Sequence, residues 1–253
     1  RPVHIIGKDI LIPAHSIYWP IMLHAMGFPD DKIPQLLVHG FWNGLRGEKM
    51  SKSLGNIVDP SELADKFGSE AVRYYLVRDI ITGKDSDFDL NRLVMLYNTE
   101  LANALGNLCN RALNMSQTFT EGVIHTSGEL TQDDLDLRKS LADSIADYRT
   151  AMDDYDISRG LEAINRHVVH CNGYAERMKP WELNKVVKET GDPVTKARVA
   201  TILYHLAESV AHAAVLLSPI IPDATAKLAS QLALPGLGDL KLGDLAWGLL
   251  PRS

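Results

Sequence analysis

The sequence predicts an α/β segment followed by an all-α region, and three observations lead to this fold class. The first forty residues show a strand, helix, strand pattern, and a polar stretch that contains glycine follows it. From about residue 90 onward, apolar residues recur at helical spacing over long segments, and strand patterns are almost absent. We therefore expect three units, at residues 1–42, 43–96 and 97–253.

The first unit has the pattern of a parallel βαβ arrangement. Residues 3–6 and residues 36–38 are short apolar stretches typical of strands, and residues 13–26 between them carry apolar side chains at helical spacing. Such a unit implies a right-handed crossover between parallel strands. Ligands bind beyond the carboxyl ends of parallel strands, where residues 7–9 and 39–41 would lie.

The second unit begins with a mobile-looking loop at residues 43–56. Arg46, Lys49 and Lys52 against Glu48 give this loop a local charge of +2. Two short helices and a polar turn are expected after it, at residues 60–66, 69–78 and 82–87.

The third unit is expected to be a helical bundle. Long amphipathic helices are predicted at residues 91–117, 132–152, 158–178 and 193–217, with a shorter one at 223–232. Thr131 and Asp156 stand where N-caps belong, and Pro193 follows Asp192 as a proline at the first helical position would.

The composition is that of an ordinary globular protein. Of the 253 residues, 45% are hydrophobic and 23% are charged, which excludes a disordered chain, a fibrous repeat and a disulfide-stapled miniprotein. The net charge is −6, so any contact with nucleic acid must come from a local basic patch. Cys109 and Cys171 form no CxxC pair and no zinc ligand set, and their helix-like apolar context predicts buried free thiols.

We expect no contact with a membrane. The longest apolar run, residues 210–222, is interrupted by His212, Ser218 and Pro219 and is too short to span a bilayer. No secretory signal is visible. The chain begins with Arg1 rather than Met, so we also expect an upstream segment.

The sharpest chemical feature is the sequence Lys-Met-Ser-Lys-Ser at residues 49–53, followed by Leu-Gly-Asn. Two lysines three residues apart, among serines and glycine, can wrap around a polyphosphate and stabilise charge that moves between phosphate oxygens. The simpler alternative is a solvated lysine pair in a surface loop.

These residues match the KMSKS loop of class I aminoacyl-tRNA synthetases, and the surrounding sequence resembles the methionyl-tRNA synthetases. The resemblance covers nearly the whole chain, more weakly from about residue 190 onward. The isoleucyl, valyl, leucyl and cysteinyl enzymes share a loop of this type but not the whole set of motifs. That set stands at residues 7–10, 15–20, 38–40, 98–103, 106–111 and 179–181.

The resemblance implies the C-terminal part of a Rossmann-type parallel sheet at residues 1–42, a KMSKS loop and stem-contact segment at 43–96, and an anticodon-binding bundle at 97–253. It implies activation of methionine with ATP and Mg²⁺, and transfer to tRNA(Met), in the cytoplasm. In the family the other ATP motif, any zinc-bearing insert and much of the methionine pocket lie in an N-terminal half that this chain lacks. We therefore expect the isolated chain to be inactive, and the missing N-terminal half to be its partner.

The resemblance also assigns roles in the activation of methionine. It makes Lys52 the catalytic lysine that stabilises the transferred phosphoryl group and pyrophosphate, with Lys49 assisting. It places Ser51 and Ser53 on the ATP phosphates as well, and Gly7 and Asp9 beside the adenosine. Lys8 could approach phosphate or face solvent.

For the amino acid, the resemblance places His15 at the methionine side chain. This sequence has one residue more between Asp9 and His15 than the family pattern. The alternative is a buried structural histidine near Trp19.

Three further residues match family positions that read the CAU anticodon. Asn107 and Arg111 share a helix face, and Trp181 could offer a stacking surface, although the indole could equally be a core residue. Residues 158–188 carry six basic and three acidic side chains, and this excess of +3 could hold tRNA phosphates or be a solvated helix face.

Two alternatives remain at this point. One is a stand-alone tRNA-binding module or a non-catalytic paralogue that keeps the loop without the chemistry. The other is a different class I synthetase, with the isoleucyl enzyme as the nearest competitor.

Overall fold

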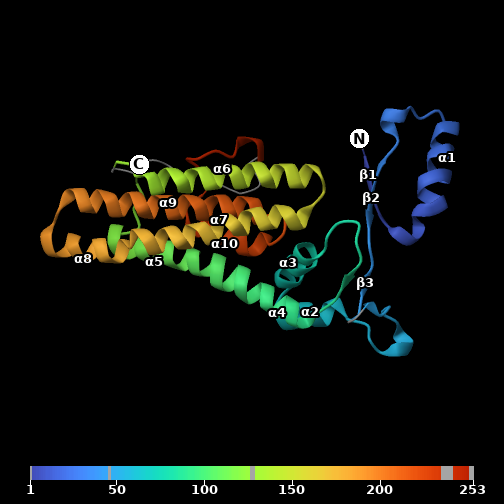
Figure 1. Cartoon of the computed structure of the whole chain (residues 1–253), viewed down its shortest axis with the longest axis horizontal. Helices are drawn as coiled ribbons and strands as arrows, with labels where there is room; N and C mark the ends of the chain where they lie inside the picture. The colour runs from blue at the N-terminus through green and yellow to red at the C-terminus, as the bar shows by residue number, and fades with distance from the viewer. Residues whose placement is uncertain (1, 45–46, 126–128, 235–241, 251–253) are drawn as a thin grey trace.

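The computed structural model describes residues 2–44, 47–125, 129–234 and 242–250. It is elongated, with a small α/β unit at one end, a helical bundle at the other, and short helices between them (Figure 1). The predicted order of an α/β segment followed by an all-α region is confirmed.

The α/β unit is built around two parallel strands, as the sequence predicts. Strand β1 (Val3–Gly7) pairs with β2 (Gln35–His39), with Val3 opposite Gln35 and Gly7 opposite His39. The crossover contains a π-helical segment η2 (Leu11–Tyr18) that runs into helix α1 (Trp19–Ala25). Ile12 within this segment has extended backbone angles, φ −112° and ψ 129°, so the crossover is kinked three residues before His15.

The central segment is held together by a small aromatic and aliphatic core. Helices α2 (Pro60–Phe67) and α3 (Ser69–Asp79) follow the loop, and Val72, Tyr75 and Leu93 are buried in this core. Strands β3 (Trp42–Asn43) and β4 (Ser86–Asp87) form a second parallel pair. The sequence pattern did not predict this pair because a two-residue strand is too short to show an alternating pattern.

The helical bundle begins with one long helical run and contains one helix that the sequence pattern did not predict. The run comprises α4 (Leu90–Leu96), the π-helical segment η6 (Tyr97–Gly106) and α5 (Asn107–Thr120). Helix α8 was not predicted, although Pro180 at its first position and Gly191 at its C-cap were available signals. The other bundle helices are α6 (Gln132–Asp153), α7 (Ile157–Met178), α8 (Pro180–Thr190), α9 (Pro193–Leu217) and α10 (Pro222–Gln231).

The predicted caps are confirmed. Thr131 and Asp134 form a capping box at the start of α6, and the Asp156 carboxylate accepts a hydrogen bond from the Arg159 amide. The Asp192 carboxylate accepts from two amides at the start of α9, ahead of Pro193.

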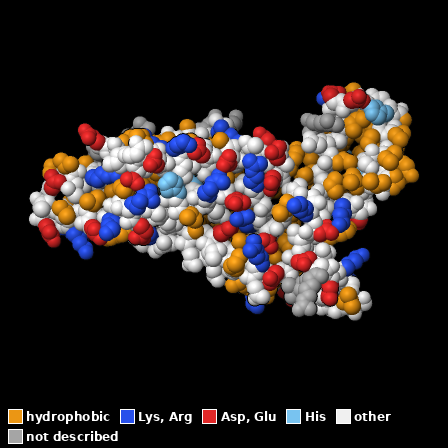
Figure 2. Space-filling view, in the orientation of Figure 1, with side chains coloured by type: hydrophobic (Ala, Val, Ile, Leu, Met, Phe, Trp, Pro, Cys, Tyr) orange, Lys and Arg blue, Asp and Glu red, His pale blue; other side chains and the backbone are white. Residues whose placement is uncertain are grey.

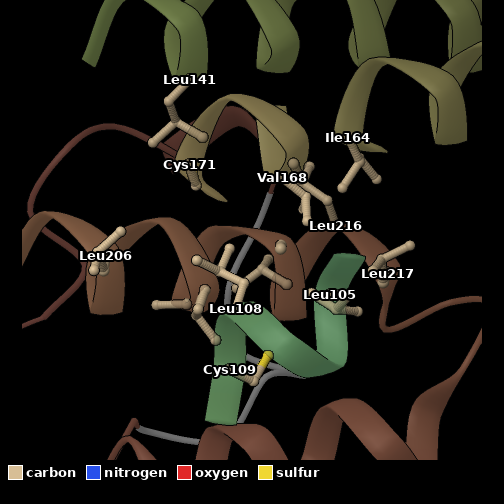
Figure 3. Close-up of a cluster of buried hydrophobic side chains, with 14 of the residues drawn as sticks. Leu105, Leu108, Cys109, Leu141, Ile164, Val168, Cys171, Leu206, Leu216 and Leu217 are labelled. Atoms are coloured by element: carbon tan, nitrogen blue, oxygen red, sulfur yellow. The ribbon is translucent and has the colours of Figure 1, made fainter. Parts of the chain in front are cut away.

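The core of the bundle is organised around helix α9. Every residue from Val199 to Leu217 is buried, and side chains from η6, α5, α6 and α7 pack against this helix (Figure 3). Within the described residues α9 has the length and apolar composition of a membrane span, but here it is the core helix of the bundle. Cys109 and Cys171 are buried free thiols, as predicted.

Candidate functional site

The Lys49–Ser53 loop is shaped by its own polar side chains. Ser51 caps the short helix η5 (Lys52–Leu54), and its hydroxyl accepts a hydrogen bond from the Leu54 amide at 3.3 Å. Asn56 fastens the other side, since its Oδ1 accepts from the Ser51 amide at 2.8 Å and its Nδ2 donates to the Lys49 carbonyl at 3.3 Å. The loop therefore has a defined backbone shape without burying its lysines.

The two lysines of this loop are exposed and available. Within the described part of the chain, neither Lys49 nor Lys52 forms an ion pair with a carboxylate. The hydroxyls of Ser51 and Ser53 lie 3.2 Å apart beside them. Two ammonium groups and two hydroxyls on one short loop form a cationic donor set suited to phosphate oxygens. Arg46, which contributes to the predicted +2 charge, lies outside the described residues.

The loop is connected to the strand ends of the α/β unit by two aspartates. Asp85 accepts a hydrogen bond from the Phe41 amide at 2.9 Å and forms an ion pair with Lys8 at 2.5 Å. Asp87 accepts from the Gly47 amide at 3.0 Å, within the loop that carries the lysines. The Lys8 ammonium and the Phe41 amide together lower the pKa of Asp85 below its usual value. The structure thus gives Lys8 a carboxylate partner that neither sequence-based alternative foresaw.

Gly7 and Asp9 lie together at the end of strand β1. A Cβ placed on Gly7 would approach the Asp9 carboxylate oxygen to 2.5 Å, so the carboxylate folds back over the glycine. Gly7 pairs with His39, whose imidazole Nδ1 lies 2.9 Å from the Gly40 carbonyl. The predicted adenosine-facing residues therefore share the carboxyl edge of the two strands.

His15 lines a hollow of about 420 Å³ between the crossover and the sheet. His4 from β1, Tyr18, Trp19 and Met22 surround it with apolar and aromatic surface. The His15 Nδ1 donates to the Ile10 carbonyl at 2.8 Å, which fixes the ring. The hollow is suited to a small apolar side chain.

At the far end of the molecule the structure brings two of the three predicted RNA-reading residues together. The Arg111 guanidinium lies over the Trp181 ring at 5.1 Å from its centroid, and Arg111 Nη1 lies 2.8 Å from the Glu176 carboxylate. Asn107 is exposed one turn before Arg111 on α5. Trp181 is half-buried at the start of α8, neither a core residue nor a free one.

The basic excess of residues 158–188 is smaller in three dimensions than in the sequence. Arg166 pairs with Asp147, and Arg177 pairs with Asp133 at 3.0 Å; both aspartates belong to the neighbouring helix α6. Counting charges along one segment could not include acids from another helix. Three basic side chains remain without an ion pair in the described structure: Arg159, Lys185 and Lys188.

Among the residues that the structure describes, no group of three or more His, Cys, Asp or Glu side chains could hold a metal ion. Four residues that hold the site residues in place were not predicted from the sequence: Asn56, Asp85, Asp87 and Glu176. Only Asn56 had a sequence signal, since it follows Leu54-Gly55 directly after the lysine loop.

Two family models match the chain and together cover most of it. The model described as "tRNA synthetases class I (M)" matches residues 1–113. The model described as "Anticodon binding domain of methionyl tRNA ligase" matches residues 124–238. The second match contains α6 to α10 of the helical bundle, whereas α4, η6 and the first half of α5 fall in the first match.

Similar proteins and solved structures agree with the family models. The methionine–tRNA ligase of Caldanaerobacter subterraneus subsp. tengcongensis is 37% identical over 92% of this chain, and that of Bacillus subtilis is 36% identical over 92%. A solved structure of Mycobacterium tuberculosis methionyl-tRNA synthetase in complex with methionyl-adenylate superposes with a TM-score of 0.85 at 34% identity. The superposed region covers 99% of this chain and 50% of the Mycobacterium tuberculosis chain.

The family models and the solved structure place the chain among the class I aminoacyl-tRNA synthetases. Within this class, the chain belongs to the methionyl-tRNA synthetase family. The chain spans about a third of the length of the curated relatives it matches, 35% in the first case and 34% in the second. The family match does not favour a different class I synthetase, nor does it favour a stand-alone tRNA-binding module or non-catalytic paralogue.

Proposed function

We propose that this chain supplies the KMSKS loop and the anticodon-reading surface of an enzyme that activates methionine with ATP and transfers it to tRNA(Met). The observation that carries the proposal is the Lys49–Ser53 loop. Its two lysines are exposed, it is tied to the strand ends through Asp87 and β3, and it belongs to a chain of this family.

In the proposed first step, a carboxylate oxygen of methionine attacks the α-phosphorus of ATP. The bond from this phosphorus to the bridging oxygen breaks, and pyrophosphate leaves. Lys52 stabilises charge on the α-phosphoryl group and on the leaving pyrophosphate, Lys49 assists, and the hydroxyls of Ser51 and Ser53 donate to phosphate oxygens. ATP enters as its Mg²⁺ complex, in which phosphate oxygens and water hold the ion.

The other substrates would contact the remaining predicted residues. Gly7 and Asp9 border the adenosine, and His15 borders the methionine side chain in the 420 Å³ hollow. In the second step a ribose hydroxyl at the 3′ end of tRNA attacks the activated carbonyl, and AMP leaves. Asn107 and Arg111 read the edges of unpaired anticodon bases, and the Trp181 ring stacks on one of them.

We also propose that an upstream half of the same enzyme covers the α/β unit. Parallel sheets are normally covered on both faces, whereas β1 and β2 form a sheet of only two strands. Apolar side chains crowd the surface of this unit, and Ile5 and Ile12 are 70% and 72% exposed (Figure 2). Their burial against a second half would complete the sheet and bring the rest of the ATP site to the loop.

We propose a cytoplasmic location, since protein synthesis consumes methionyl-tRNA there.

We also propose that the three units of the chain meet at residues 42/43 and 96/97. The second boundary falls inside the continuous helical run that joins α4, η6 and α5. A unit boundary within a helix would make the two units rotate together.

The experiment is ATP–pyrophosphate exchange with the full-length protein that contains this chain. Methionine should support exchange and isoleucine should not, and the isolated chain should show none. Loss of methionine dependence, or exchange supported equally by isoleucine, would overturn the proposed specificity. Absence of exchange together with retained tRNA(Met) binding would instead identify a non-catalytic module.

A further inference from the structure

Helix α3 is fastened to the helical bundle along its first half. The Glu70 carboxylate accepts hydrogen bonds from the Asp223 and Ala224 amides, at 2.5 and 3.0 Å, and so caps the start of α10. One turn later, the Arg73 guanidinium donates to the carbonyls of Pro219 and Ile220, both at 3.0 Å. Two charged side chains therefore hold the turn between α9 and α10 against α3.

The second half of α3 is fastened by a bidentate ion pair. Arg78 donates through Nε and Nη2 to the two carboxylate oxygens of Glu100, each at 3.0 Å, and both side chains are over 80% buried. The Tyr74 hydroxyl donates to the same carboxylate at 2.7 Å and accepts from Asn165 of α7 at 2.7 Å. Burial, reinforced by Glu100, raises the pKa of Tyr74, so the phenol stays a donor at neutral pH.

The segment after α3 reaches in the opposite direction, toward the lysine loop. Thr82 still contacts the bundle, because its hydroxyl donates to the Tyr155 carbonyl at 2.8 Å. Three and five residues later, Asp85 and Asp87 bind the amides of Phe41 and Gly47. Residues 70–87 therefore form one chain segment that is hydrogen-bonded to the bundle over its first part and to the base of the loop at its end.

Glu100 lies on the helical run that also carries the anticodon-reading side chains. It belongs to η6, which continues directly into α5, where Asn107 and Arg111 stand. The Arg78–Glu100 pair therefore joins the η6 part of this run to the second half of α3, beyond the contacts that α3 makes with α4. A folded tRNA that engages both sites at once tolerates little error in the orientation of this run relative to the loop, because simultaneous binding is lost when the geometry does not match.

We propose that Arg78 and Glu100 are positioning residues for tRNA charging, which fix the angle between the anticodon-reading helix and the KMSKS loop. This inference rests on the proposed function. It assigns neither residue a contact with ATP, methionine or RNA. The pair should therefore affect the charging of intact tRNA, which needs both ends of the tRNA. It should not affect a step that needs only one of the two sites, such as adenylate formation or the binding of an anticodon hairpin.

The test compares Arg78→Gln and Glu100→Gln with the wild type in the full-length protein. Methionine-dependent ATP–pyrophosphate exchange, and the affinity for an RNA hairpin with a CAU loop, should each stay within about twofold, as for substitutions outside a binding site. The kcat/KM for charging intact tRNA(Met) should fall by about tenfold or more, because small misplacements at a reacting centre are costly. Arg78→Lys, which keeps one donor for Glu100, should recover part of this loss.

Lys139→Gln is the matched control. Lys139 forms an exposed ion pair with Asp143 one turn later on the same helix, α6, so this pair joins neither α3 nor the run that carries Asn107 and Arg111. All three measurements should stay within about twofold for this variant. Thr82→Val replaces the hydroxyl that is bonded to the Tyr155 carbonyl by a methyl group, and gives a second test should Arg78→Gln unfold the protein. This variant too should lower charging alone.

The outcomes separate the inference from the proposed function. Unchanged charging in Arg78→Gln and Thr82→Val would overturn the inference. A parallel fall in exchange, hairpin binding and charging would also overturn it, because the pair would then have only a structural role. A wild-type protein without methionine-dependent exchange and without hairpin binding would refute the proposed function instead.

Discussion

The Arg111 guanidinium lies over the ring of Trp181, 70 positions later in the chain, with 5.1 Å between its central carbon and the ring centroid. Helices α5 and α8 supply the two side chains, and Glu176 at the end of α7 holds the same guanidinium from another direction. Both contacts of Arg111 are made in the structure without RNA. Such preorganisation lowers the entropy that binding would otherwise cost.

Replacement of Trp181 should separate the two steps of the reaction. Trp181→Ala removes the stacking surface and the partner of Arg111, at a cost of about 1–3 kcal/mol per stacked base. Charging of tRNA(Met) by the full-length protein should fall severely, while tRNA-independent adenylate formation stays nearly intact. Trp181→Phe keeps an aromatic face and should retain most of the charging activity. Equal damage to both steps would show that Trp181 is a structural residue.

Loss of the second lysine of the loop should affect the chemical step. Lys52→Ala removes one donor to the transition state and should lower adenylate formation in the full-length protein by roughly 10²–10³, mainly in kcat. Lys32→Ala, an exposed lysine outside the loop, is the control and should change nothing. ATP–pyrophosphate exchange within a few-fold of the wild type in Lys52→Ala would contradict the role.

Gly40 is required by a close approach of two backbones. A Cβ at this position would lie 2.1 Å from the Lys84 carbonyl oxygen, so the two segments would have to separate and the Asp85 contacts with Phe41 would break. Gly40→Ala should therefore destabilise the structure by about 1–3 kcal/mol, seen as a lower melting temperature. Gly243→Ala has open space around the new methyl group and should melt like the wild type.

The bundle should lose stability in mild acid because of a buried neutral histidine. Burial, with smaller effects of His170 and His212, lowers the pKa of His167 to about 3 from its usual 6.5. Between these two values the unfolded chain binds a proton that the folded chain does not, so stability falls as the pH falls. The slope per histidine is up to about 1.4 kcal/mol per pH unit.

His167→Gln should flatten this dependence in urea unfolding of the chain between pH 4 and 7. Part of the slope should remain, because burial also lowers the pKa of His205. Curves of identical slope for the variant and the wild type would show that another group is responsible. The comparison uses slopes, so a uniform loss of stability in the variant does not affect it.

The elements with strong periodicity or clear caps could be predicted from the sequence. Helices α6, α7 and α9 are where the apolar spacing places them, since their stability comes from long amphipathic faces and from caps at Thr131, Asp156 and Asp192. Helix α8 was missed although Pro180 and Gly191 mark its two ends. The β3–β4 pair could not be predicted, because each strand has only two residues and depends on a partner elsewhere in the chain.

The candidate site divides in the same way. The composition of residues 49–55 already indicates polyphosphate chemistry, because lysine, serine and glycine provide charge, donors and room in any fold. The partners of Lys8 and Arg166 could not be predicted, because Asp85 and Asp147 approach them only after folding.

The sequence by itself determined the order of the units, the long helices and the type of chemistry in the loop. These depend on local spacing and on the functional groups of neighbouring residues. Only the tertiary structure decided that Arg111 lies over Trp181, that Asn56 and Asp87 hold the loop, and that α3 links the loop to the bundle. The reason is physical: a hydrogen bond or ion pair between distant residues depends on packing, which no local pattern encodes.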